Sequence, residues 1–128
     1  MARVFLDTNV FIDLVEKRKN QISSYSSKEK LFISPLSIHI LLYVFKRKVP
    51  YLPFSDIEEI FTLITFDEFT SYKALIGPTN DFEDNVQLHS AADGECDFFL
   101  TEDKELLNMK FFGKTQIIAP QNLKYVPT

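Results

Sequence analysis

The sequence predicts an α/β/α sandwich built on a largely parallel central sheet. Short apolar runs of strand length alternate along the chain with longer segments of helical periodicity, which is the pattern of consecutive βα units. The chain has 128 residues, of which 45% are hydrophobic, so it is long enough to bury a substantial core. Its length is that of one domain, and we expect a single domain over residues 1–128.

The N-terminal half is expected to contain three strands and three helices. Val10, Phe11, Leu14 and Val15 form one apolar stripe at helical spacing, so a helix follows the first strand directly. A proline opens the second helix, and the sequence SDIE at 55–58 has the form of a capping box for the third. The expected strands are residues 4–6, 31–34 and 64–66, the expected helices are 10–19, 35–48 and 55–63, and residues 21–30 are expected to form a loop or a short helix.

The C-terminal half continues the same alternation. Gly77 and Pro78 end a helix expected over residues 68–76, because glycine suits the position after a helix and proline cannot extend one. Another helix is expected over residues 81–94. The last two expected strands are residues 97–100 and 116–119.

Composition and charge exclude several classes of protein. The net charge of −4 argues against a protein that coats nucleic acid with its whole surface. One cysteine, Cys96, excludes an intramolecular disulfide and a cysteine-based zinc site. No apolar stretch approaches the roughly 20 residues that span a bilayer, and no signal peptide is recognisable, so we expect a cytoplasmic protein without a membrane. Two basic clusters could form a local basic strip or simply end helices: Lys17-Arg18-Lys19 and Lys46-Arg47-Lys48.

Polar residues follow the first expected strand in an unusual run. Asp7, Thr8 and Asn9 separate two apolar segments, although capping the following helix would need only one of them. Asp81 and Asp84 lie three residues apart at a helix start, where they either share one helix face or complement the helix dipole.

The acids become more informative when they are considered together. Asp103 closely follows the strand that ends at Leu100, although it too could cap a short helix. Carboxyl ends of parallel strands meet at one edge of a sheet, so Asp7, Asp84 and Asp103 could gather there. Gathered carboxylates repel one another unless a cation neutralises them, and oxygen-only ligands suit Mg²⁺ or Mn²⁺. Such an ion polarises a phosphoryl oxygen and activates water. No Ser-His-Asp set, cysteine nucleophile or glycine-rich phosphate loop competes with this reading.

Several segments, in this order and with suitable gaps, resemble one known family. The segments are RVFLDTNVFIDL, FISPLSIHILLYVFKR, DFEDNVQLHSA and CDFFLTEDKEL, followed by IIAPQNL. Together they resemble the PIN domain, the nuclease fold of many VapC-type toxins. The resemblance covers nearly the whole chain and depends on the order of the segments rather than on any one of them.

The resemblance implies a site and an activity. It makes Asp7, Asp84 and Asp103 catalytic acids and metal ligands, with Asn9 supporting the site or a metal-bound water and Thr8 a minor polar neighbour. Asp81 becomes a further supporting ligand. The implied activity is hydrolysis of RNA phosphodiester bonds with Mg²⁺ or Mn²⁺, by one ion or two. The implied partners are RNA, an antitoxin protein and a second copy of the chain.

Two departures from the family pattern bear on that expectation. The family usually has a glutamate three residues after a Ser or Thr in its second block, but here Ile40 follows Ser37 at that interval. His39 is adjacent but points about 100° away on a helix, so we do not expect it to replace the acid, and we expect His89 to be structural. Glu102 stands where an arginine is common, which could either weaken the approach of RNA or help to hold a cation.

Two other functions remain open from the sequence. One is a PIN-like module that binds nucleic acid or a partner and has lost catalysis, with Ile40 as its signature. The other is a phosphotransfer enzyme of the haloacid dehalogenase type, which also places an aspartate after its first strand. That class needs a second aspartate two residues later, where this chain has Asn9.

Overall fold

A six-stranded sheet forms the centre of the molecule. A computed structural model describes residues 1–17 and 29–125, and its strands lie in the order β3-β2-β1-β4-β6-β5. The pairs β3-β2, β2-β1, β1-β4 and β4-β6 are parallel, whereas β5 runs antiparallel to β6. The strands are β1 (Ala2–Leu6), β2 (Glu29–Ile33), β3 (Phe61–Leu63), β4 (Phe98–Leu100), β5 (Phe111–Phe112) and β6 (Thr115–Ile118). The predicted largely parallel α/β fold is confirmed.

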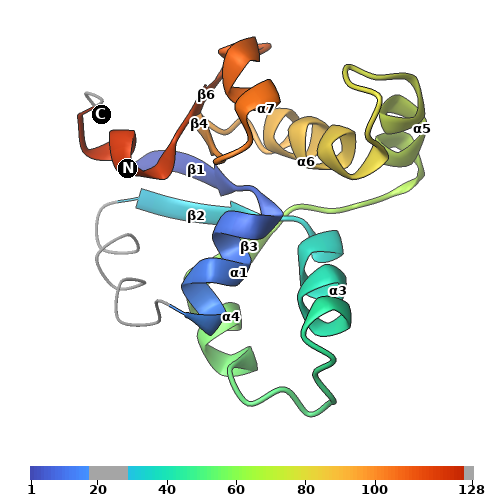
Figure 1. Cartoon of the computed structure of the whole chain (residues 1–128), viewed down its shortest axis with the longest axis vertical. Helices are drawn as coiled ribbons and strands as arrows, with labels where there is room; N and C mark the ends of the chain where they lie inside the picture. The colour runs from blue at the N-terminus through green and yellow to red at the C-terminus, as the bar shows by residue number, and fades with distance from the viewer. Residues whose placement is uncertain (18–28, 126–128) are drawn as a thin grey trace.

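Helices cover this sheet, as Figure 1 shows. They are α1 (Thr8–Glu16), α3 (Pro35–Val44), α4 (Phe54–Ile60), α5 (Glu68–Ile76), α6 (Phe82–Asp93) and α7 (Lys104–Met109), followed by the 3₁₀ helix η2 (Pro120–Tyr125). Helix α1 packs against α3, and α5 packs against α6 rather than against the sheet. No helix of the described segments is long and apolar enough to cross a membrane.

Alternating side chains of the strands build two cores, one on each face of the sheet. Val4 and Leu6 of β1 join the residues of α1, α3 and α4 in one cluster, whereas Phe5 joins Leu88 of α6 and Leu106 of α7 in the other. The other parallel strands alternate in the same way. Strands buried on both faces read as continuous apolar runs, which explains the sequences VFL, LFI and FFL.

Several predicted boundaries were wrong. The third strand is residues 61–63 instead of 64–66, and α4 ends at Ile60 rather than Leu63. The segment from residue 60 to 66 is largely apolar, so periodicity could not set the register. Parallel pairing with β2 sets it instead, and Phe61 packs edge-on against Phe11.

Helix ends and caps differ as well. The proposed capping box at 55–58 is not formed, because α4 begins at Phe54 after Pro53 and has no side-chain cap hydrogen bond. Helix α3 ends at Val44, and Lys46 has a positive φ of 52° that stops it well before residue 48. Helix α1 begins at Thr8, earlier than expected. Its predicted end at residue 19 and most of the predicted loop at 21–30 lie outside the described residues, and β5 was not predicted.

The strand ends bring two segments distant in sequence together at the carboxyl edge of the sheet. The backbone N–H of Asp7 donates to the carbonyl of Leu100 at 2.9 Å, and that of Thr101 donates to the carbonyl of Ile118 at 3.1 Å. The residues that directly follow β1 and β4 are therefore neighbours. This is the position where parallel α/β sheets place their sites.

Candidate active site

Asp7 is a buried carboxylate at the end of the central strand β1. Its exposed fraction is 7%. Oδ1 accepts a hydrogen bond from the backbone N–H of Thr8 at 2.8 Å, and Oδ2 accepts one from the hydroxyl of Thr101 at 2.7 Å. Burial raises the pKa of Asp7, and these two hydrogen bonds oppose that rise because they favour the ionised form. The fold thus holds a buried carboxyl group in one fixed orientation.

Thr101 connects Asp7 to Asp103. While its hydroxyl donates to Asp7, the same oxygen accepts from the backbone N–H of Asp103 at 3.0 Å. Asp103 caps α7 through Oδ1, which accepts from the N–H groups of Glu105 and Leu106 at 2.8 and 3.2 Å. One fully buried hydroxyl therefore fixes one acid through its side chain and the other through its backbone.

Asp81 and Asp84 lie at the start of α6. Oδ1 of Asp81 accepts from the backbone N–H of Asp84 at 2.9 Å, so Asp81 caps the helix and Asp84 lies within its first turn. Partial burial raises the pKa of Asp84 to about 7, and repulsion from Asp81, Asp7 and Asp103 adds to the rise. The pKa of the neighbouring Glu83 is raised too, by burial and then by Asp81 and Asp7.

The structure places the four acids that the sequence suggested at the starts of α1, α6 and α7. Asp7, Asp81 and Asp103 do cap helices, as the simpler explanation for each of them required. Capping uses only Oδ1 in each case, however, and Asp84 is not a cap. Asp103 and Asp81 act electrostatically on Asp7, and Asp81, Asp7 and Asp103 act on Asp84, so these carboxyl groups lie near enough to repel one another.

The donor set suits a hard divalent ion, but it does not form a closed cage. Within residues 1–17 and 29–125, no three His, Cys, Asp or Glu side chains are grouped closely enough to hold a metal ion by themselves. Mg²⁺ often binds through one or two carboxylates and keeps several waters, so an open oxygen site still suits it. Asp7, Asp84 and Asp103 are the candidate ligands, with Asp81 beside them.

The other residues of the polar run point in different directions. Asn9 is exposed on α1 and has no hydrogen bond within the described residues. Thr8 is buried and directs its hydroxyl away from the acids, toward Ser37 of α3 at 2.9 Å.

Ile40, the main departure from the family pattern, is partly buried and packs against the core cluster that contains α1 and β1. His39 is exposed and stacks on Tyr43 with ring centroids 6.1 Å apart, so it has no place among the acids. His89 contacts the carbonyl of Gly77 at 2.9 Å and lies edge-on to Phe112, which makes it structural as predicted. Glu102 is exposed beside the edge of the sheet.

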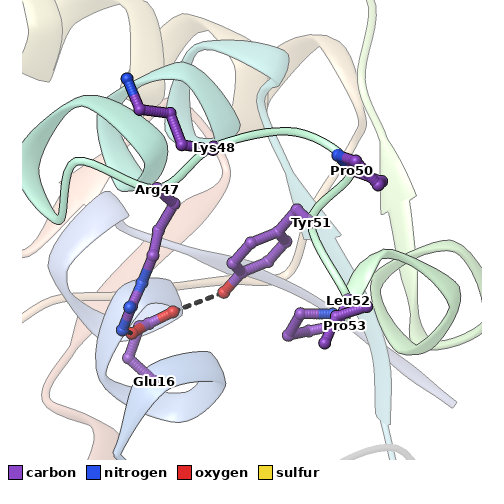
Figure 2. Close-up of a pocket in the computed structure, with 7 residues that line it drawn as sticks. All are labelled: Glu16, Arg47, Lys48, Pro50, Tyr51, Leu52 and Pro53. Atoms are coloured by element: carbon purple, nitrogen blue, oxygen red, sulfur yellow. Dashed lines mark hydrogen bonds and ion pairs between the residues drawn. The ribbon is translucent and has the colours of Figure 1, made fainter.

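The second basic cluster is only partly available to a ligand. The guanidinium of Arg47 forms an ion pair with Glu16, and the hydroxyl of Tyr51 donates to the same carboxylate at 2.5 Å. Both side chains point toward Glu16, whereas Lys48 extends away from it (Figure 2). These residues line a pocket of about 390 Å³ between α1 and the segment that joins α3 to α4. Arg47 therefore anchors this segment through Glu16, while Lys46, Arg47 and Lys48 are all exposed.

Three residues of the site escaped the sequence reasoning. They are Thr101, Ser37 and Gln87, which are all fully buried. Thr101 directly follows β4 and precedes Asp103 by two residues. Its position at the carboxyl end of a parallel strand was a usable signal of a site residue. Ser37 and Gln87 lie on helices of weak amphipathic contrast, where the sequence offers no comparable signal.

A family model described as PIN domain matches residues 3–105. The chain therefore belongs to the PIN domain family. PIN domains are generally nucleases that use divalent metal ions, so the match favours a nuclease over the phosphotransfer class. No curated protein matches the sequence.

Proposed function

We propose that the chain is a Mg²⁺- or Mn²⁺-dependent endoribonuclease, a toxin-type PIN protein of a toxin–antitoxin pair that acts in the cytoplasm. The observation that carries the proposal is the placement of Asp7 and Asp103 after β1 and β4, connected through Thr101, in a chain that matches the PIN domain model. Burial, and then repulsion by Asp81, Asp7 and Asp103, raises the pKa of the further acid Asp84 to about 7. Such an accumulation of like charge is destabilising by itself, and a bound cation would relieve it.

Each acid has a distinct part in the proposed reaction. Asp7 and Asp84 would hold the ion, Asp103 would complete the set, and Asp81 would support it directly or through water. The bound ion would supply an activated water and neutralise charge on the phosphate that is attacked. The hydroxyl of Thr101 donates to Asp7, which favours its ionised form and fixes its orientation, while the exposed Asn9 would hydrogen-bond a water or the substrate.

The pH dependence follows from Asp84. A carboxylate must be ionised to bind the ion, so metal affinity should rise as the pH passes through 7 and level off above it. Without a metal ion, burial and then repulsion by the other acids favour the protonated form of Asp84 up to about pH 7. Metal and protons thus compete for the same oxygen atoms.

The test is cleavage of single-stranded RNA across a Mn²⁺ titration. We expect wild type to cut and both Asp7→Asn and Asp84→Asn to lose nearly all activity. Asp56→Asn is the matched control, because Asp56 is an exposed acid in the first turn of α4. Folded wild-type protein that cuts no RNA at any Mn²⁺ concentration would contradict the proposal.

A second function is favoured by one observation, which is the aliphatic side chain of Ile40. It packs into the core where the resembled proteins carry a glutamate, so α3 supplies no acid at that position. A PIN-like module that binds RNA or a partner without cutting would fit this loss. RNA binding that persists in EDTA, without cleavage in Mn²⁺, would identify it.

We further propose that two copies of the chain pair through α5. Thr70 and Ala74 bury one face of this helix, while its opposite face exposes four large apolar side chains, Phe69 (67%), Tyr72 (60%), Leu75 (72%) and Ile76 (90%). They offer on the order of 500 Å² of apolar surface, against about 800 Å² per partner in a standard interface. One helix face pairing with its own copy would form a closed two-fold dimer. An antitoxin protein would then regulate the dimer by covering the acids.

A further inference from the structure

A buried chain of hydrogen bonds lies behind the candidate metal ligands. The hydroxyls of Thr8 and Ser37 are 2.9 Å apart, and the hydroxyl of Ser37 donates to Oε1 of Gln87 at 3.3 Å. The exposed fractions of Thr8, Ser37 and Gln87 are 1%, 0% and 0%. These three residues, from α1, α3 and α6, are called the positioning chain below.

The direction of these hydrogen bonds is fixed by the atoms available. A carbonyl oxygen only accepts, so Ser37 uses its single proton on Gln87. The hydroxyl of Thr8 must then donate to Ser37. Ser37 therefore has two defined partners, Thr8 and Gln87, and removing the hydroxyl of Thr8 leaves Ser37 without its donor.

Gln87 is an energetically unfavourable residue at this buried position. Among the buried side-chain atoms of the described residues, Nε2 of Gln87 and the hydroxyl of Ser90, one turn further along α6, lack a hydrogen-bond partner. Leaving such a buried group without a hydrogen-bond partner destabilises the folded protein. An apolar residue of similar size would avoid that cost, so stability alone does not explain a glutamine here.

The members of the positioning chain are adjacent to the candidate ligands in sequence. Thr8 directly follows Asp7, and its backbone N–H donates to that carboxylate. Gln87 lies one turn after Asp84 on α6, so the two side chains share roughly one face of the helix. Ser37 lies on α3, three residues before Ile40, and contributes a neutral hydroxyl from the helix that lacks an acid.

We propose that Thr8, Ser37 and Gln87 form a positioning chain that sets the separation between the carboxylates of Asp7 and Asp84. This inference rests on the proposed metal-dependent function. In this protein, α3 contributes to the site through Ser37, which connects α1 to α6 by hydrogen bonds. It supplies no ligand at residue 40. The three residues touch neither metal nor RNA, so they act only through the acids.

The decisive variant is Thr8→Val, which keeps the shape of the side chain and removes the hydroxyl. The readout is Mn²⁺ affinity measured by calorimetry, below the melting temperature of every variant. Loss of a residue that orients ligands typically lowers metal affinity 10–100-fold, and we expect that loss here. Thr8→Ser keeps the hydroxyl and should bind Mn²⁺ within about threefold of wild type.

Thr115→Val is the matched control. The hydroxyl of Thr115 is equally buried and donates to the carbonyl of Cys96 at 2.8 Å, but Thr115 lies where β6 starts, at the opposite edge of the sheet. It should lower the melting temperature without changing Mn²⁺ affinity. In metal-free protein, the decreases in melting temperature caused by Thr8→Val and Gln87→Met should not be additive, because both substitutions interrupt the same positioning chain.

The outcomes separate this inference from the proposed function. Wild type that neither binds Mn²⁺ nor cuts RNA would overturn both. Wild type that binds Mn²⁺ while Thr8→Val binds it equally well would overturn the positioning chain alone. If Thr8→Val does not fold, Ser37→Ala breaks the same chain at its centre, and unchanged Mn²⁺ affinity in that variant would equally overturn it.

Discussion

Replacing Asp84 with asparagine should stabilise the metal-free protein at neutral and alkaline pH. Asp84 has a pKa of about 7, against an ordinary value of 3.8. A rise of this size corresponds to about 4 kcal/mol for a fully buried group. Because Asp84 is only partly buried, solvent screens the repulsion and we expect about 2 kcal/mol. For a chain of this length, that amounts to a gain of roughly 6 °C in melting temperature.

The sign of the effect depends on pH. The folded protein keeps a proton on Asp84 up to about pH 7, whereas the unfolded chain releases it near pH 4. Wild type should therefore lose stability relative to Asp84→Asn as the pH rises from about 4 to 7. Below pH 4 the two proteins should melt alike, and above pH 7 their difference should be constant.

The assay is thermal unfolding of both proteins at several pH values, with EDTA and then with millimolar Mn²⁺. Mn²⁺ binds only the folded form, so it should raise the melting temperature of wild type and leave Asp84→Asn nearly unchanged. The Asp56→Asn control should change little in any condition. A metal-free Asp84→Asn protein that is less stable than wild type at pH 8 would refute the idea that crowded acids destabilise this edge.

Other predictions concern the departure at residue 40, the basic segment and the dimer. Ile40→Glu should lower the free energy of unfolding by about 1–3 kcal/mol in denaturant, because Ile40 packs against the core. The same variant should need a lower Mn²⁺ concentration for cleavage. Wild type that is already fully active at low Mn²⁺ would argue against this. Tyr51→Phe should cost about 1 kcal/mol by removing a hydrogen bond to the Glu16 carboxylate, whereas the exposed Tyr43→Phe should cost nothing measurable. Tyr72→Asp should convert a dimer into a monomer in light scattering, and a wild type that is already monomeric would remove α5 as the interface.

The sequence predicted the class of fold well because burial on both faces leaves a clear signature. VFL, LFI and FFL are continuous apolar runs, and each proved to be a strand with side chains in both cores. The boundaries were harder wherever an apolar run exceeded the length of its strand. Between residues 60 and 66, only pairing with β2 decides which three residues form β3.

The site was predictable in part for a related reason. Asp7 and Asp103 follow strands, and strand ends in a parallel sheet meet at one edge, so sequence order alone placed these acids together. The partners that fix them were not predictable. Whether the hydroxyl of Thr101 reaches Asp7 depends on a contact across 94 positions in the sequence, which no local pattern encodes.

An aspartate at this edge of the sheet can cap a helix with one carboxyl oxygen and still leave the other for the proposed metal site. An aspartate that caps a helix points one oxygen at backbone N–H groups and is held rigidly by them. Asp7, Asp81 and Asp103 each do this with Oδ1, at the starts of α1, α6 and α7. Asp84 caps nothing, and its pKa is the one raised to about 7. The three caps therefore fix three of the four acids, and under the proposed function Asp84 is the acid whose charge a bound cation would stabilise most.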